Sequence, residues 1–262
     1  MIAGYDSVGN AMLALGLTVP RVTGAFLMLP LLTQQTVPAM VRNSFLVSLA
    51  IVAMPIAMAG APVDFMDNPV WIALILKELF LGISLGFCFG IVFWAIGAAG
   101  SVMDSQVGMG MASIFDPIQG HQISLHGQFL SQLAAWLFMA SGAFLVFLDL
   151  LLSSYVLWPV MSYTPVLGSG GMSVFVGHFD YLMTTLLVMA APAMVLLLVI
   201  DLTFGLVNRY APQLNVFALT LPIKAWIATA VILLLIGVYV EIVLKRLAAN
   251  RGLLDLLDRA FS

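Results

Sequence analysis

Residues 69–100 read PVWIALILKELFLGISLGFCFGIVFWAIGAAG and contain only two charged side chains, Lys77 and Glu78. A helix rises 1.5 Å per residue, so about 20 apolar residues cross the hydrocarbon core of a bilayer. Trp71 and Trp94 lie roughly 34 Å apart along such a helix, close to the distance between the two membrane interfaces. A β-barrel would instead show short alternating segments. The stretch therefore predicts one long membrane helix.

The composition of the whole chain agrees with a membrane protein. Of the 262 residues, 63% are hydrophobic and 8% are charged, whereas a soluble domain carries about a quarter charged residues. Lipid or other apolar protein must cover the remaining surface. We predict an all-α, polytopic integral membrane protein and exclude a soluble enzyme. The net charge of −3 leaves no concentrated basic face, which excludes nucleic acid as a partner.

Working outward from residues 69–100, the chain contains about six hydrophobic helices. The predicted runs are 10–32, 37–60, 69–100, 126–152, 177–208 and 217–245. The first fifteen residues contain Asp6 and no Lys or Arg, so we expect no cleaved signal peptide.

The charges near the C-terminus predict the orientation of the chain. Lys245, Arg246, Arg251 and Arg259 place that end in the cytoplasm by the positive-inside rule. We divide the chain into a membrane domain, residues 1–245, and an amphipathic cytoplasmic tail, residues 246–262. The tail is expected to lie on the membrane or against a partner.

Small residues recur along the helix at 69–100. Glu78, Gly82, Gly86 and Gly90 are four residues apart and form one stripe, which lets another helix approach closely. We expect a partner helix there, with Glu78 paired to a neighbouring cation. The alternative is a proton or ion relay, which one acid without a nearby helical histidine supports poorly. Lys77 begins a second row of residues, which lies beside this stripe on the same helix.

Three further charges lie in or beside the last two apolar runs. Asp201 precedes Arg209, and Lys224 lies near the start of the following run. A pair between Asp201 and either cation would offset part of the cost of burying each charge. We predict a structural ion pair, with transport chemistry as the alternative.

The connection from Ser101 to Pro117 combines polar residues with glycine and methionine. It contains Asp104, Gln106, Gly108, Met109, Gly110, Met111 and Phe115. Glycine frees the backbone, and methionine is apolar and deformable. As an exposed loop it would leave several apolar side chains in water. We therefore predict a re-entrant or plug-like segment buried in protein.

No pattern indicates catalysis, a cofactor or a metal. The chain lacks a phosphate-binding loop, a nucleophile elbow and HExxH. His121 and His126 are expected in a loop, and their spacing does not suit metal ligands on one helix face. The single cysteine, Cys88, is predicted to be a small buried side chain.

Residues spread over most of the chain resemble a known family, the T component of the type III secretion export apparatus, the virulence counterpart of flagellar FliR. The carrying residues are Pro20, Arg21, Pro30, Arg42, Lys77, Glu78, Gly82, Gly86, Asp104, Gln106, Gly108, Met111, Ser113, Ser154, Trp158 and Val160, with RYAPQLNVF at 209–217 and LPIK at 221–224.

The resemblance implies a structural role in protein export. Family members assemble with R and S components into a helical gate in the bacterial inner membrane, at the centre of the secretion basal body. Unfolded secreted proteins pass through its channel, and U and V components contact its cytoplasmic side. The family fold is built of helical hairpins, and one loop helps plug the channel; by position this is residues 104–117.

Two other functions compete with this interpretation. A secondary transporter of a small solute or ion should show related halves and paired broken helices, and no clear internal repeat is visible. A membrane enzyme would need a convergent set of His, Asp, Glu and Ser side chains, which the sequence does not show.

Overall fold

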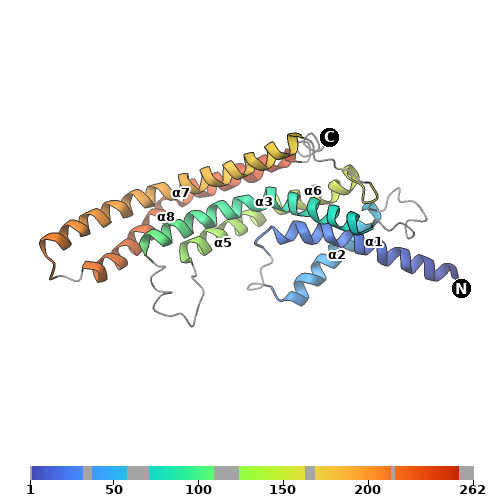
Figure 1. Cartoon of the computed structure of the whole chain (residues 1–262), viewed down its shortest axis with the longest axis horizontal. Helices are drawn as coiled ribbons and strands as arrows, with labels where there is room; N and C mark the ends of the chain where they lie inside the picture. Colours follow the sequence, from blue (N-terminus) through green and yellow to red (C-terminus); the bar gives the residue numbers. More distant parts are fainter. Residues whose placement is uncertain are drawn as a thin grey trace. The chain divides into compact units, whose positions relative to one another are not determined.

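The computed structural model describes residues 2–31, 37–57, 71–108, 124–162, 169–213 and 216–253. Within these ranges every regular element is a helix, so the predicted all-α fold is confirmed (Figure 1). The helices are α1 (Ile2–Leu27), α2 (Ala39–Ala57), α3 (Trp71–Val107), α5 (Leu125–Ala140), α6 (Ala143–Leu157), α7 (Ser169–Tyr210) and α8 (Val216–Ala249), followed by the short 3₁₀ helix η2 (Asn250–Gly252).

The chain forms two compact units. The first unit comprises Met1–Ile91, Ser141–His178 and Leu247–Ser262, and it holds α1, α2, α6 and the first part of α3. The second unit comprises Val92–Ala140 and Phe179–Arg246, and it holds α5, the end of α3 and most of α7 and α8. Each unit therefore combines segments that are distant in sequence.

The run predicted at 126–152 is not one helix. It is divided into α5 and α6 by a break at residues 141 and 142. Gly142 lies at the break with a φ of 74°, a left-handed conformation that glycine adopts without steric cost. The apolar run continues through the break, so hydrophobicity alone did not reveal it.

Four described helices are long and apolar enough to cross a membrane: α2, α3, α7 and α8. The pair of α5 and α6, counted as one span, would make a fifth. The apolar part of α1, Met12–Leu27, is shorter. The polytopic membrane fold is thus confirmed, with four or five candidate spans among the described residues where the sequence predicted about six.

Helix α3 differs from the other candidate spans. It has 37 residues, or about 55 Å, which exceeds the roughly 30 Å hydrocarbon core of a bilayer. Its most apolar stretch is 72% buried, against 17% for α2 and 28% for α7 and α8. Helix α3 is therefore packed inside the protein. It also continues past Gly100, where the sequence prediction ended it.

The end of α3 is set by glycine. Gly108 has a φ of 97°, and its N–H lies 3.2 Å from the carbonyl oxygens of Asp104 and Ser105. A left-handed glycine of this kind commonly terminates a helix and satisfies its last carbonyls.

Apolar side chains form a separate core in each unit. In the first unit, Phe26 meets Phe45 and Phe147 edge to face, with ring centroids 5.5 and 5.3 Å apart, an arrangement that aromatic rings favour. In the second unit, Phe93 and Phe138 join α3 to α5, with centroids 5.4 Å apart.

Helices α7 and α8 run side by side (Figure 1). The hydroxyl of Tyr239 on α8 donates to the carbonyl oxygen of Met189 on α7 at 2.9 Å. The two helices therefore form a long hairpin within the second unit.

The start of the predicted tail packs in the first unit. Asn250 and Leu253 are buried, and Asn250 Nδ2 donates to the carbonyl oxygen of Cys88 at 3.5 Å. Cys88 itself is buried, as predicted. The remainder of the predicted amphipathic tail, residues 254–262, lies outside the described residues.

Candidate functional site: buried polar networks in each unit

The first network is centred on Arg21, whose side chain is fully buried on α1. Its Nε donates to Glu78 Oε2 at 2.6 Å, and its Nη2 donates to Glu78 Oε1 at 2.8 Å. Glu78 lies on α3 and is also fully buried. Such a fork between a guanidinium and a carboxylate is stronger and more directional than a neutral hydrogen bond.

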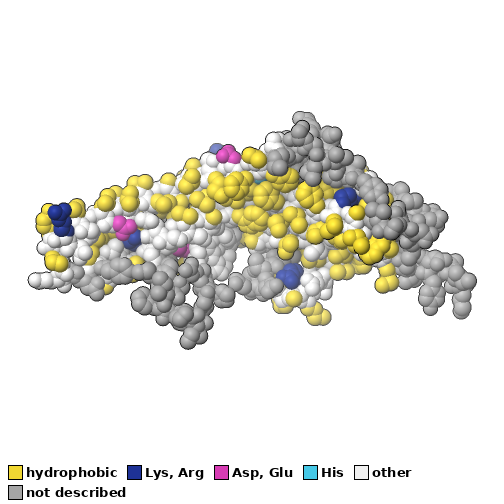
Figure 2. All heavy atoms as spheres, in the orientation of Figure 1, with side chains coloured by type: hydrophobic (Ala, Val, Ile, Leu, Met, Phe, Trp, Pro, Cys, Tyr) yellow, Lys and Arg dark blue, Asp and Glu magenta, His cyan; other side chains and the backbone are white. Residues whose placement is uncertain are grey.

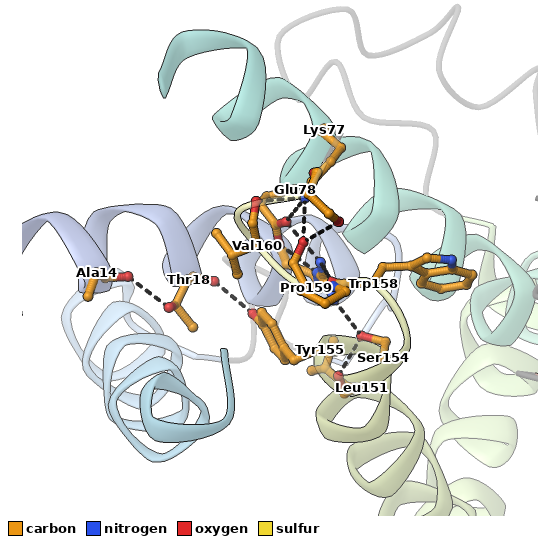
Figure 3. A network of polar contacts seen from close by, with 12 residues as sticks. Ala14, Thr18, Lys77, Glu78, Leu151, Ser154, Tyr155, Trp158, Pro159 and Val160 are labelled. Carbon is orange, nitrogen blue, oxygen red and sulfur yellow. Dashed lines mark hydrogen bonds and ion pairs between the residues drawn. The ribbon is translucent and has the colours of Figure 1, made fainter. Parts of the chain in front are cut away.

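The remaining donors of Arg21 bind the end of α6, where Figure 3 labels Ser154, Tyr155 and Trp158. Nη1 donates to Ser154 Oγ at 3.1 Å, and Nη2 donates to the Trp158 carbonyl oxygen at 2.8 Å. The guanidinium also lies 4.1 Å from the ring centroid of Tyr155, within range of a cation–π interaction. Arg21 thus joins α1, α3 and α6.

Tyr155 and Thr18 extend this network along α1. The Tyr155 hydroxyl donates to the carbonyl oxygen of Thr18 at 2.9 Å, while Thr18 Oγ1 donates to the Ala14 carbonyl oxygen at 2.8 Å (Figure 3). Both side chains are buried. Burying a hydroxyl is costly unless it is hydrogen-bonded, and these contacts remove that cost.

The glycine stripe explains how α1 comes so close to α3. A Cβ atom on Gly82 would lie 2.1 Å from the Arg21 carbonyl oxygen, and one on Gly86 would lie 2.2 Å from the Ala25 carbonyl oxygen. No side chain fits at those distances. In the structure the helix against Gly82 and Gly86 is α1 of the same chain, where the sequence analysis expected one from a partner. Gly90, the last member of the stripe, is buried.

The second unit contains a separate ion pair between α7 and α8. Lys224 Nζ lies 2.8 Å from Asp201 Oδ1, and Gln106 Nε2 on α3 donates to Asp201 Oδ2 at 3.2 Å. Lys224 is buried, whereas the Asp201 side chain is 37% exposed. Of the two cations that the sequence offered to Asp201, the structure places Lys224 beside it, while Arg209 is exposed at the end of α7.

A third group of polar contacts lies where α3 ends and α5 begins. Asp104 Oδ2 accepts hydrogen bonds from Ser124 Oγ at 2.6 Å and from the backbone N–H of His126 at 3.0 Å. Asp104 Oδ1 is paired with His126 Nδ1. Ser124 Oγ also accepts the Gly127 N–H at 3.0 Å. The N-terminus of α5 thereby gains both a capping hydroxyl and a carboxylate, each of which is favourable there.

His126 extends this group to α8. Its Nε2 lies 3.0 Å from Thr229 Oγ1, and the Thr229 hydroxyl donates to the Ala225 carbonyl oxygen at 2.9 Å. The imidazole therefore connects α3, through Asp104, with α8. The sequence analysis began the fourth apolar run at His126 but also described this residue as part of the preceding loop. The structure places it as the second residue of α5.

The predicted plug segment is described only in part. Asp104 and Gln106 belong to the last turns of α3 and not to a loop, and Gly108 is the residue that ends the helix. The loop assignment failed for these positions because their polar side chains were taken as the end of the apolar helix. Met109, Gly110, Met111 and Phe115, like His121, lie outside the described residues.

Comparison with known proteins identifies the family of this chain. Residues 12–249 match the family described as bacterial export proteins, family 1. The chain belongs to this family.

Individual family members are similar over most of their length. The Yop proteins translocation protein T of Yersinia pestis is 35% identical over 230 residues, which cover 87% of this chain and 88% of that protein. The surface presentation of antigens protein SpaR of Salmonella typhimurium is 31% identical, covering 88% and 85%. The flagellar biosynthetic protein FliR of Bacillus subtilis is 30% identical, covering 86% of each chain. The resemblance stated from the sequence motifs is confirmed.

In this export-family chain, the charged groups of the networks bind one another. Arg21 with Glu78 and Lys224 with Asp201 are held in ion pairs. Among the described residues, no group of three or more His, Cys, Asp or Glu side chains is placed to hold a metal ion. The arrangement is suited to holding helices in register.

Sequence reasoning missed the role of Arg21 and the pairing of Asp104 with His126. Arg21 was noted only as part of the family resemblance. A charge inside an apolar run needs a buried partner, and this signal could have linked Arg21 to Glu78. No comparable sequence pattern indicated the Asp104–His126 contact. The predicted ends of the two flanking helices were wrong, so these two residues were not expected to meet.

Proposed function

We propose that this chain is a structural, non-catalytic subunit of the type III secretion export gate, which forms with R and S components the channel for unfolded secreted proteins. The observation that carries the proposal is its 35% identity to the Yop proteins translocation protein T over 87% of this chain and 88% of that protein. Such coverage supports a shared role for the whole chain.

The exposed apolar surface supports assembly with other hydrophobic partners. On α7, Leu187, Val195 and Leu202 are each at least 60% exposed, and Figure 2 shows hydrophobic side chains along this helix with few charged ones between them. On α2, Met40 and Val52 are similarly exposed. Extended rows of exposed apolar side chains are not left in contact with water. We therefore propose that the bilayer and the R and S subunits cover them.

The proposal extends to location and contacts. The gate would lie in the bacterial inner membrane at the centre of the basal body, with U and V components on its cytoplasmic side. Residues 104–117 would close the channel at rest, and residues 246–262 would form an amphipathic tail on the cytoplasmic side.

Co-purification tests this proposal. A tagged chain is expressed with R, S and U components from the same bacterium, and the detergent-solubilised complex is sized and its subunits identified by mass spectrometry. We expect one complex that contains this chain with R and S. Purification of this chain alone, while R and S assemble without it, would contradict the proposal and favour the transporter alternative.

A further inference from the structure

Lys77 lies among more oxygen atoms than it has protons. Its Nζ is 3.0 Å from the Pro159 carbonyl oxygen, 2.8 Å from that of Val160 and 2.9 Å from that of Ser162. Glu78 Oε1 is a fourth oxygen at 2.9 Å. An ammonium group has three N–H donors, so at least one oxygen is held by charge alone. The arrangement has the character of an ion's coordination shell (Figure 3).

The three carbonyl groups are directed at this point by the turn that follows α6. Trp158 N–H donates to the Ser154 carbonyl oxygen at 2.9 Å and ends the helix. Ser162 then closes the turn, because its N–H and its Oγ donate to the Pro159 carbonyl oxygen at 3.1 and 2.8 Å. These bonds do not involve Lys77, so the turn closes and the Pro159 carbonyl oxygen is held without its ammonium.

The electrostatics of this turn require a cation. The C-terminal end of a helix carries partial negative charge, and the carbonyl groups beyond α6 add to it. Arg21 neutralises Glu78 with its fork and binds the Trp158 carbonyl oxygen. The remaining three carbonyl oxygens accept hydrogen bonds from Lys77, whose side chain is 12% exposed. Without its ammonium they would converge with no counter-charge.

The oxygen atoms around Nζ lie at ordinary N–H···O hydrogen-bond distances, and this shell is wider than a divalent ion requires. Oxygen ligands lie 2.3–2.6 Å from Ca²⁺ and 2.0–2.1 Å from Mg²⁺, whereas the four oxygens here lie 2.8–3.0 Å from Nζ. Rings of backbone carbonyls are the ligands that replace water around K⁺ in channels. The shell therefore suits a large monovalent cation.

We propose that the Pro159, Val160 and Ser162 carbonyl oxygens and Glu78 Oε1 form a monovalent-cation site, and that the ammonium of Lys77 is its tethered resident ion. Through this ion, α3 holds the turn after α6 in place. It follows that a chain without the ammonium binds free K⁺ or NH₄⁺ at this site.

The test uses Lys77→Ala in the full chain, purified in detergent with any chains that accompany it. The midpoint of thermal unfolding is measured at constant ionic strength in choline, potassium, ammonium or magnesium chloride. We expect the variant to unfold at a lower temperature than the wild type in choline. Potassium or ammonium should restore much of the shift with a saturable dependence, because a ligand that binds only the folded state stabilises it. Magnesium should not.

Lys245→Ala is the matched control, because Lys245 is 75% exposed and its ion-pair partner is Glu241, one turn away on the same helix. The wild type and this control should be indifferent to the choice of monovalent cation. A Lys77→Ala variant as stable as the wild type in choline would overturn the proposal. So would a destabilised variant that does not respond to potassium or ammonium.

A second variant decides the matter if Lys77→Ala does not accumulate. Lys77→Gln keeps N–H donors but carries no charge. Unfolding of Lys77→Gln at the wild-type temperature would show that hydrogen bonds hold the turn, and the proposal would fail. A clear loss of stability in Lys77→Gln would support the need for a cation. Neither result depends on the export role, which the co-purification experiment tests separately.

Discussion

Arg21 on α1 and Glu78 on α3 are 57 residues apart in sequence and form a two-point ion pair with both side chains fully buried. Nε binds one carboxylate oxygen and Nη2 the other, so the planar fork fixes both the distance and the rotation of one helix against the other. The same guanidinium reaches α6 through Ser154 and Trp158. This residue sets the register of three helices.

Arg21→Ala should strongly destabilise the chain, because it leaves the Glu78 charge buried with only Lys77 beside it. Removing one partner of a buried pair typically costs about 3–5 kcal/mol. Arg21→Lys should not restore stability, since a lysine cannot form the fork. The measurement is the unfolding midpoint of the purified protein and its level in membranes. The exposed pair of Glu241 and Lys245 is the control, and Glu241→Ala should change little. An Arg21→Ala protein with the same unfolding midpoint as the wild type would disprove the central role of Arg21.

Gly86→Leu should disrupt the packing of α1 on α3. Even a Cβ at this position would lie 2.2 Å from the Ala25 carbonyl oxygen, and backbone cannot move aside without separating the helices. We expect loss of folded protein and of assembly together. Gly205→Ala on α7 is the control, because a Cβ there meets nothing within 4 Å and alanine favours a helix by about 1 kcal/mol over glycine. If Gly86→Leu folds and assembles normally, the close approach of α1 is not required.

Gly82 and Gly86 show how far the sequence alone could predict the packing. Four-residue spacing was sufficient to place Gly82 and Gly86 on one face of a helix, and apolar run lengths were sufficient for α2, α7 and α8. Spacing does not say which helix meets that face, because α1 and a partner's helix would use the same small residues. Nor could hydropathy reveal the break at Gly142, which depends on a backbone angle.

Asp201→Ala should destabilise the α7–α8 hairpin by leaving Lys224 without its carboxylate. Because the Asp201 side chain is 37% exposed, water screens the remaining charge, and the loss should be well below the about 3–5 kcal/mol of a fully buried pair. The double variant Asp201→Lys with Lys224→Asp should recover part of the stability and of secretion. Arg209→Ala, which removes an exposed cation on the same helix, should have little effect. If the Asp201→Ala variant secretes as much protein as the wild type, the pair does not have the role proposed for it.

Asp104→Ala should loosen the junction of α3 with α5. The substitution removes the acceptor for Ser124, for the His126 N–H and for the imidazole, so the first turn of α5 loses most of its cap. We expect faster amide hydrogen exchange at residues 125–128 in the folded protein, with little change at residues 185–195 of α7. Thr229→Val removes the far contact of His126 and the hydrogen bond within α8 to the Ala225 carbonyl oxygen, but it keeps the Asp104 contacts. It should therefore affect exchange in α5 less. Unchanged exchange at residues 125–128 in Asp104→Ala would show that other contacts hold the junction.

Deleting residues 108–111 should make the assembled gate leak. An open pore wide enough for a polypeptide would also pass ions and collapse the membrane potential, so the resting channel must be closed, and we assign this closure to residues 104–117. Deformable methionine and flexible glycine suit a segment that packs into an irregular opening and yields to a passing chain. The deletion keeps Asp104 and Gln106, whose contacts hold the end of α3. Ion or small-solute leak is measured in cells that express this chain with R and S, with assembly checked by co-purification. The leak should disappear when R and S are omitted, because in the proposed gate the channel is formed by all three components. A deletion complex that assembles and stays as tight as the wild type would show that other residues close the channel.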